Sequence, residues 1–296
     1  MPDESPLNDQ ERRTRHESEE HWRHLVETHP DAIIIIEGAQ LTYANEATAE
    51  LLGVECPADL VGREVQDFIA PEDRAKFKRR NKQLRQGREV PPTLYHVQRA
   101  DDAKRQVEVY VSPTQYEGRR AHQVVVRDVT ERRERAERLR RQQDALRRLT
   151  HRQIDETRDL DATLAQVTET LSRTLETARV SVWLRDDDRS AFYCRDRYDR
   201  DHGEHTQGKT REIQRHTDYL RDLNEERISV FSDAQNDDRV RSFLPYFKAN
   251  NIGSIMSAPI HVDGRLVGVL LHEHRGGSRS WTSDEQHFAG SAADLA

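Results

Sequence analysis

The first half of the chain carries apolar runs with the spacing of a small antiparallel sheet. The stretches 32–38 and 40–45 predict two short strands that turn at Gly38. Asn45 stands where a helix N-cap belongs, and Gly53 stands where that helix would end in a left-handed conformation. The pattern therefore predicts a hairpin that is followed at once by a short helix.

A longer helix and three further strands complete this half. Pro71 near its start and Gly87 just past its end delimit the helix. The stretch "VEVYV" then places alternate valines on one face, as in a half-buried antiparallel strand. The three strands are predicted at 93–100, 105–113 and 121–129.

The second half opens with an amphipathic helix. Over 159–175 the apolar residues recur at helical spacing. They are Leu160, Leu164, Val167, Leu171 and Leu175. A second amphipathic segment, with the apolar residues of "RVRSFLPYFKANN", is predicted to be helical at 239–251.

Two hairpins and a capped helix are predicted around these helices. The hairpins span 179–196 and 258–274, and Asp263-Gly264 supplies the two-residue turn of the second hairpin. Thr282 and Glu285 have the spacing of a capping box at the start of a last helix. Each half is therefore predicted to be an α+β domain with a central antiparallel sheet flanked by helices.

Between the halves, the chain passes from a run of valines into a charged helix with no glycine or proline over 122–150. Leu139, Leu146 and Leu149 form a sparse, heptad-like leucine seam within it. We expect this helix to pair with its copy in a homodimer and to relay conformational change. A break in the helical register is expected at 150–159.

Composition and charge exclude several functions. The 296 residues suffice for two domains, and the net charge of −7 comes from interleaved acidic and basic residues, so no basic face predicts nucleic-acid binding. The apolar run at 32–36 is far shorter than the about 20 residues of a membrane span. Cys56 and Cys194 are too few for a disulfide framework or a zinc site. A cytoplasmic protein that does not bind a membrane is expected.

Motifs in the first half resemble those of PAS domains. The stretch "LVETHPDAIIIIEGAQLTYANEATAELLG" is similar to the start of a PAS domain. "RDVTERR" matches the Asp-x-Thr motif that closes one, which assigns a signal-relay role to Asp128 and Thr130. The resemblance implies a PAS domain at 18–130, after a disordered or helical segment at 1–17.

The second half resembles GAF domains, through "RYDRDHGEH", "NIGSIMSAPIHVDGRLVGVLLHEH" and "WTSDEQ". The implied domain covers 159–296, which leaves 131–158 as a helical, coiled-coil signalling linker. Together the two resemblances point to the N-terminal sensory region of prokaryotic sensor histidine kinases, haloarchaeal ones among them. The fold class implied is α+β, with two domains.

Both resemblances imply pockets for small ligands, but neither identifies the ligand. Val65 stands where flavin-binding PAS domains carry the reactive cysteine, and 71–87 contains no histidine for haem. The cysteine that attaches a bilin to GAF domains is also missing, so no flavin adduct, haem or bilin is expected. Cys194, His272 and His274 are the candidate cofactor-binding residues, and no metal site is expected.

The function expected is ligand sensing and signal relay without catalysis. His151 lacks the acidic residue and the proline that accompany phosphoacceptor histidines, and no nucleotide-binding or nucleophile motif is present. The partners expected are a second copy of the chain, an unidentified small molecule, and a downstream kinase or response regulator. Two alternatives stay open: the sensory region of a transcription regulator of the bacterio-opsin activator type, and a stand-alone PAS–GAF adaptor.

Overall fold

The computed structural model describes residues 21, 23–152, 160–186, 191–212 and 217–295. The chain divides into two compact units, Met1–Arg135 and Ala136–Ala296. Each unit contains one antiparallel sheet with helices packed on it, so the predicted α+β class is confirmed.

The first unit is built on a five-stranded sheet with the strand order β2-β1-β5-β4-β3. All neighbouring strands pair antiparallel. Gly38 adopts a φ of 66° in the turn between β1 and β2, as the pattern predicted. The strands are β1 (Ala32–Glu37), β2 (Gln40–Ala44), β3 (Thr93–Gln98), β4 (Lys104–Tyr116) and β5 (Arg119–Asp128).

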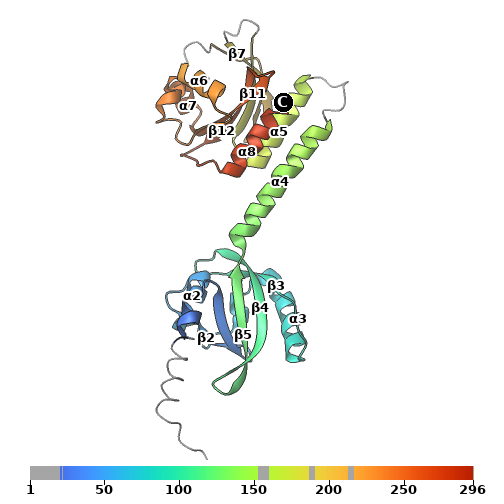
Figure 1. Cartoon of the computed structure of the whole chain (residues 1–296), viewed down its shortest axis with the longest axis vertical. Coiled ribbons are helices and arrows are strands. Elements are labelled where there is room, and N and C mark those ends of the chain that lie inside the picture. The colour runs from blue at the N-terminus through green and yellow to red at the C-terminus, as the bar shows by residue number, and fades with distance from the viewer. Residues whose placement is uncertain (1–20, 22, 153–159, 187–190, 213–216, 296) are drawn as a thin grey trace, which may run out of the picture. The chain divides into compact units, whose positions relative to one another are not determined.

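Short helices form the hydrophobic core of the first unit together with this sheet (Figure 1). The helix predicted to begin near Pro71 starts with a 3-10 turn, because the α-helical hydrogen bonds begin only at Arg74. Leu60, Tyr95 and Val107 are almost fully buried in the core. The helices are α2 (Glu46–Leu52), η1 (Pro57–Leu60), η2 (Val65–Phe68), η3 (Pro71–Asp73) and α3 (Arg74–Arg85).

The second unit is built on a seven-stranded sheet with the order β10-β11-β12-β6-β7-β8, and β9 pairs with β7 beside β8. Asp263 and Gly264 have φ angles of 51° and 73°, which confirms the predicted two-residue turn. The strands are β6 (Arg179–Arg185), β7 (Ala191–Asp199), β8 (Glu204–Thr206), β9 (Thr210–Glu212), β10 (Ser229–Phe231), β11 (Ile252–Val262) and β12 (Arg265–Arg275).

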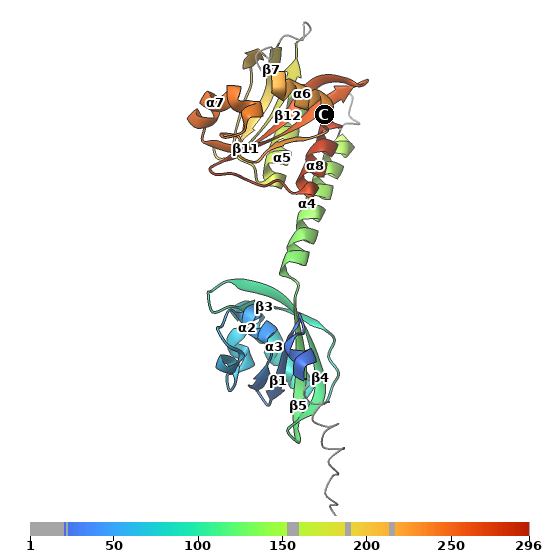
Figure 2. The same cartoon turned by 60° about the vertical axis from the view of Figure 1, so that its left-hand side comes forward.

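Helices cover both faces of the second sheet (Figures 1 and 2). On one face lie α5 (Leu160–Leu175) and α8 (Ser283–Ala293), and α8 begins with the predicted capping box. The other face packs against α6 (Thr217–Glu225), η4 (Asp238–Phe243) and α7 (Leu244–Ala249). The two faces therefore belong to two separate hydrophobic clusters.

Helix α4 runs from Thr130 to Arg152. In the second unit, Ala145 and Leu149 are buried in the cluster that also contains Leu164 and Leu171 of α5. Leu146 packs against the same cluster. The second half of α4 is therefore part of the core of the second unit, and the expected register break lies largely outside the described residues.

Within the described residues, no helix has both the length and the apolar character that crossing a membrane requires.

Asn45 joins the start of the first unit to its sheet. Its side-chain oxygen accepts hydrogen bonds from the backbone N–H of Ile33 at 2.9 Å and of Thr48 at 3.2 Å, which confirms the predicted N-cap. Its amide nitrogen donates to the carbonyls of Val26 at 2.9 Å and Asp31 at 3.2 Å. Because Asn45 is fully buried and its bonds to Ile33 and Thr48 are buried with it, removing the side chain leaves these two N–H groups without a partner.

We predict that Asn45→Ala lowers the free energy of unfolding of the first unit by about 2 to 4 kcal/mol. Calorimetric unfolding of the full chain measures this loss, and the transition of the second unit should stay in place. Glu50→Ala, at an exposed position of α2, is the matched control and should change little. A loss below about 1 kcal/mol for Asn45→Ala would contradict the assigned hydrogen bonds.

Candidate functional site

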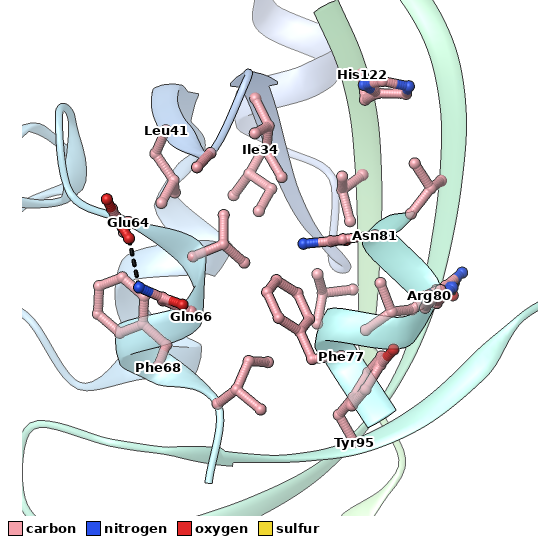
Figure 3. Close-up of a pocket in the computed structure, with 18 of the residues that line it drawn as sticks. Ile34, Leu41, Glu64, Gln66, Phe68, Phe77, Arg80, Asn81, Tyr95 and His122 are labelled. Atoms are coloured by element: carbon pink, nitrogen blue, oxygen red, sulfur yellow. Dashed lines mark hydrogen bonds between the residues drawn. The ribbon is translucent and has the colours of Figure 1, made fainter. Parts of the chain in front are cut away.

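The first unit encloses a cavity of about 490 Å³ between its sheet and its helices (Figure 3). Its lining is mainly aliphatic and aromatic. Helix α3 contributes the largest share of the lining, followed by β1, β5, α2 and η2, and the typical lining residues are Ile34, Leu41, Phe68, Phe77 and Val124. This volume lies within the range of about 300 to 1,000 Å³ that is usual for small-molecule sites.

A few polar groups interrupt this apolar lining. The Asn81 side chain of α3 points toward Ile34 and Phe77 in Figure 3. Tyr95 is 1% exposed, and its hydroxyl has no hydrogen-bond partner of good geometry among the described residues. Burial raises the pKa of Tyr95, and the positive charge of Arg80 beside it opposes this rise. The phenol therefore stays protonated and keeps its ability to donate a hydrogen bond.

Arg80 closes the α3 side of this polar region. Its Nη2 donates to the carbonyls of Pro91 at 3.2 Å and Val109 at 3.0 Å, whereas its Nε has no partner among the described residues. The guanidinium is thus buried without a carboxylate within salt-bridge distance in the part of the chain that is described. Its positive charge favours an electron-rich group at this end of the cavity.

Asp128 and Thr130 attach the first turn of α4 to strand β4. The Thr130 backbone N–H donates to Asp128 Oδ1 at 2.8 Å, and Thr130 Oγ1 accepts from the Gln106 backbone N–H at 2.8 Å. The Val129 backbone N–H also donates to the Gln106 carbonyl, at 2.9 Å. We call the group of Asp128, Thr130 and Gln106 the Thr130 anchor.

A line of hydrogen bonds continues from this anchor to the start of α3. Gln106 Nε2 lies 3.4 Å from His96 Nε2, and His96 Nδ1 lies 2.9 Å from Asp73 Oδ2. A neutral His96 with its proton on Nδ1 satisfies both contacts. Asp73 also accepts from the His96 backbone N–H at 2.7 Å. The first turn of α4 is thereby linked through side chains to the helix that carries Phe77 and Asn81.

The second unit has a much smaller cavity, of about 40 Å³, on the α6 and α7 side of its sheet. Trp183, Phe243 and Tyr246 are among its aromatic walls, and Glu273 contributes a carboxylate. Desolvation raises the pKa of Tyr246 to about 12, and the negative charge of Glu273 adds to this rise. This tyrosine is therefore a hydrogen-bond donor at every physiological pH.

The candidate cofactor residues from the sequence do not line either cavity. Cys194 is 1% exposed in the core of the second unit, and burial raises the pKa of its thiol to about 11. Such a thiol is a poor nucleophile and a poor metal ligand. His272 is fully buried near Trp281, on the opposite face of β12 from the cavity, and His274 is half-buried.

Glu273 is the cavity residue that the sequence interpretation missed. It lies between His272 and His274, and the alternation of β12 turns it to the face that the histidines avoid. The signal was present in the sequence, since an acidic residue in the apolar run "LVGVLLHEH" is unusual for a central strand. Among the described residues, no group of three metal-ligating side chains comes together.

Comparison with known families identifies both units. The PAS fold matches residues 20–129, and the GAF domain matches residues 159–296. No curated protein matches the chain.

Three of the solved structures that are similar to it serve as examples. The chromophore-binding domain of a Stigmatella aurantiaca bacteriophytochrome is 15% identical with a TM-score of 0.44, and the match covers 90% of this chain and 92% of that one. The PAS domain of an HTR-like protein from Haloarcula marismortui is 19% identical with a TM-score of 0.36, covering 41% and 99%. A phycoerythrobilin-bound GAF domain from a cyanobacterial phytochrome is 20% identical with a TM-score of 0.45, covering 52% and 90%.

His272 makes the stability of the second unit dependent on pH. Desolvation, assisted by the charge of Arg279, lowers the pKa of His272 to about 3 in the folded state. In the unfolded chain the histidine takes up a proton near pH 6.5. Above that pH its contribution to the free energy of unfolding is complete, and this contribution is lost as the pH falls toward 3. Between pH 6.5 and 5 we expect a loss of about 1 to 2 kcal/mol from this group.

The substitution His272→Leu should remove this part of the acid sensitivity. Urea unfolding of the second unit at pH 7 and at pH 5 measures it, as the difference between the two free energies of unfolding. His287→Leu, at an exposed position of α8, serves as the control and should keep the dependence of the original chain. Equal pH dependence in the His272→Leu variant and in the original chain would rule out a buried neutral histidine.

Proposed function

The chain is a tandem of a PAS domain and a GAF domain, and from this premise we propose that it is a sensory signal-transduction module. In this proposal the PAS cavity binds a small molecule, and the Thr130 anchor passes the resulting change to helix α4. The module acts by shifting between conformations and performs no chemistry of its own.

Strand β4 carries the proposal, because it serves both the cavity and the linker helix. Val109 and Val111 of this strand line the cavity. Gln106, near its start, makes the two hydrogen bonds that hold Val129 and Thr130. A ligand that moves β4 therefore acts directly on the first turn of α4, with no flexible segment between them.

The ligand class follows from the cavity lining. An apolar lining favours a hydrophobic molecule that fills about 490 Å³, and burial of its surface provides most of the binding free energy. Asn81, Tyr95 and Arg80 lie on the α3 side, where they favour a carbonyl, hydroxyl or carboxylate at one end of the ligand. We therefore propose an amphipathic ligand with one polar end.

For the output, we propose that the module controls a sensor histidine kinase in a two-component system, with a response regulator as the downstream partner. The resemblance of the sequence motifs to the sensory regions of such kinases supports this assignment. An output by DNA binding is the second candidate, supported by the resemblance to bacterio-opsin-activator-like regulators. What the gene encodes after Ala296 distinguishes the two, and a stop codon there would favour a stand-alone adaptor.

Dimerisation through α4 is also a proposal, and the packing of α4 restricts it. Leu146 and Leu149 of the leucine seam contact the core of their own chain. Leu139 is half-buried and lies outside that core. We therefore propose that a second copy of the chain packs against α4 near Leu139. A dimer contact at this position leaves the contacts of Leu149 intact.

The ligand proposal is tested on the full chain by mass spectrometry of small molecules released from the purified protein. The original chain should release a stoichiometric amphipathic compound, whereas Ile34→Phe, which puts a larger side chain into the cavity, should release much less. Adding the compound back to the ligand-free protein should change the rate of backbone amide hydrogen exchange in the first two turns of α4. Thr130→Val removes the hydroxyl that accepts from Gln106 and should abolish this change while binding persists.

Thr150→Val is the matched control for the relay, since the Thr150 hydroxyl donates to the Leu146 carbonyl within α4, at 3.0 Å. It should respond as the original chain does. Retention of the compound by Ile34→Phe would exclude the PAS cavity as its site. An unchanged exchange response in Thr130→Val would exclude the Thr130 anchor as the relay.

The two leucines of α4 should differ in their effects. Leu149→Ala should lower the free energy of unfolding of the second unit by about 2 to 5 kcal/mol, because Leu149 is buried in its core. Leu139→Ala should mainly weaken the dimer, which sedimentation velocity measures over a concentration series. If the original chain is monomeric at micromolar concentration, the proposed dimer is wrong. If Leu149→Ala unfolds at the same free energy as the original chain, Leu149 is not packed in the core of the second unit.

A further inference from the structure

The GAF cavity has the composition of a site for a cation. Trp183 of β6, Phe243 of η4 and Tyr246 of α7 present their rings to it, and we call these three residues the aromatic cage. Aromatic faces attract positive charge through the negative potential above the ring. The remaining volume of about 40 Å³ is small because a side chain of the same domain already lies among the rings.

That side chain is Arg211 of strand β9. Its guanidinium carbon lies 4.3 Å from the ring centroid of Tyr246, 5.2 Å from that of Trp183 and 5.3 Å from that of Phe243. All three distances are within the about 6 Å over which a cation and an aromatic ring attract. One guanidinium is therefore shared by three rings contributed by three different elements.

Glu273 adds a negative charge to the same cavity. It is 1% exposed, and its two oxygens accept hydrogen bonds from the Tyr246 hydroxyl at 2.8 and 3.1 Å. Among the described residues, no arginine, lysine or histidine nitrogen lies within 4.0 Å of this carboxylate. A buried carboxylate with one phenol as its partner is costly unless a cation approaches it.

We propose that this cavity is the binding site of an organic cation of the quaternary ammonium or guanidinium class, and that Arg211 occupies the aromatic cage when that ligand is absent. The three rings surround the cationic head, and Glu273 provides the complementary charge. The site is distinct from the PAS cavity and gives the GAF domain a ligand of its own.

Other ligand classes fit the cavity less well. An anion would meet the buried carboxylate of Glu273, and like charges repel strongly at low dielectric constant. A metal ion needs several oxygen, nitrogen or sulfur ligands, and the described residues offer no such group there. A neutral apolar molecule would gain no electrostatic attraction from the carboxylate of Glu273.

Arg211 can leave the aromatic cage without breaking strong interactions. Its side chain is partly exposed, and it makes no ion pair with a described carboxylate. Its strand, β9, has three residues and pairs only with Ala191, Phe192 and Tyr193 of β7. A change of side-chain rotamer therefore vacates the aromatic cage while the strand stays in place, and the ligand competes with Arg211 for the same rings.

Choline and its neutral isostere 3,3-dimethylbutan-1-ol test the proposal, because they share a shape and differ in charge. Ligand-observed NMR titration of the full chain measures both. Choline should bind at least about tenfold more tightly than the alcohol. Arg211→Ala removes the competing guanidinium and should tighten choline binding by a further factor of about ten. Adding Glu273→Gln to this variant should reverse that gain.

Arg241→Ala, which removes an exposed arginine of η4, is the matched control and should bind choline as the original chain does. Equal affinity for choline and the alcohol in the original chain would overturn the proposal, and this comparison does not depend on the folding of any variant. An unchanged affinity in a folded Arg211→Ala variant would also overturn it. Ile34→Phe, which alters only the PAS cavity, should bind choline normally, so a failure of the PAS proposal can be distinguished from a failure of this one.

Discussion

The attachment of helix α4 at two places is the constraint on which the rest of the structure depends. At its start, Thr130 is bound to Gln106 of the PAS sheet. Further along, Ala145 and Leu149 are buried among side chains of the GAF domain. The same helix is therefore a structural element of both domains, and neither attachment can shift without changing buried contacts or satisfied hydrogen bonds.

The alternation of strand β12 separates the structural and the binding faces of the GAF sheet. Leu270 and His272 face the cluster formed with α4, α5 and α8, whereas Leu271 and Glu273 face the aromatic cavity. A single strand thus contacts both the linker helix layer and the proposed ligand site. The alternation of its side chains therefore places the two faces of this one strand against two different layers.

Local sequence chemistry predicted local structure well. The Asn45 cap, the Asp263-Gly264 turn and the capping box of Thr282 are set by a few neighbouring residues, and the structure has all three. The tandem of PAS and GAF domains was also predicted correctly, because separated motifs occurred in the expected order. These features depend on short-range backbone geometry, which a sequence pattern determines directly.

The two cavities depend on contacts between residues far apart in the sequence, which a local pattern does not reveal. Glu273 meets Tyr246, which precedes it by 27 positions, and Arg211 joins rings from three elements. Likewise, the leucine seam indicated an apolar face of α4 but not which helices would cover it. Periodicity identifies a buried face, whereas the partner of that face follows only from the packed fold.

The two proposed ligands would bind in different concentration ranges. The PAS cavity of about 490 Å³ is already formed, so little reorganisation opposes ligand entry. In the GAF cavity of about 40 Å³, a ligand must first displace the Arg211 guanidinium, and its apparent affinity falls by the fraction of time that the aromatic cage is open. If both proposals hold, the PAS domain would suit a scarce apolar ligand and the GAF domain an abundant cation. Each proposed ligand would then act near α4, whose first turn is bonded to the PAS sheet and whose later turns pack in the GAF domain.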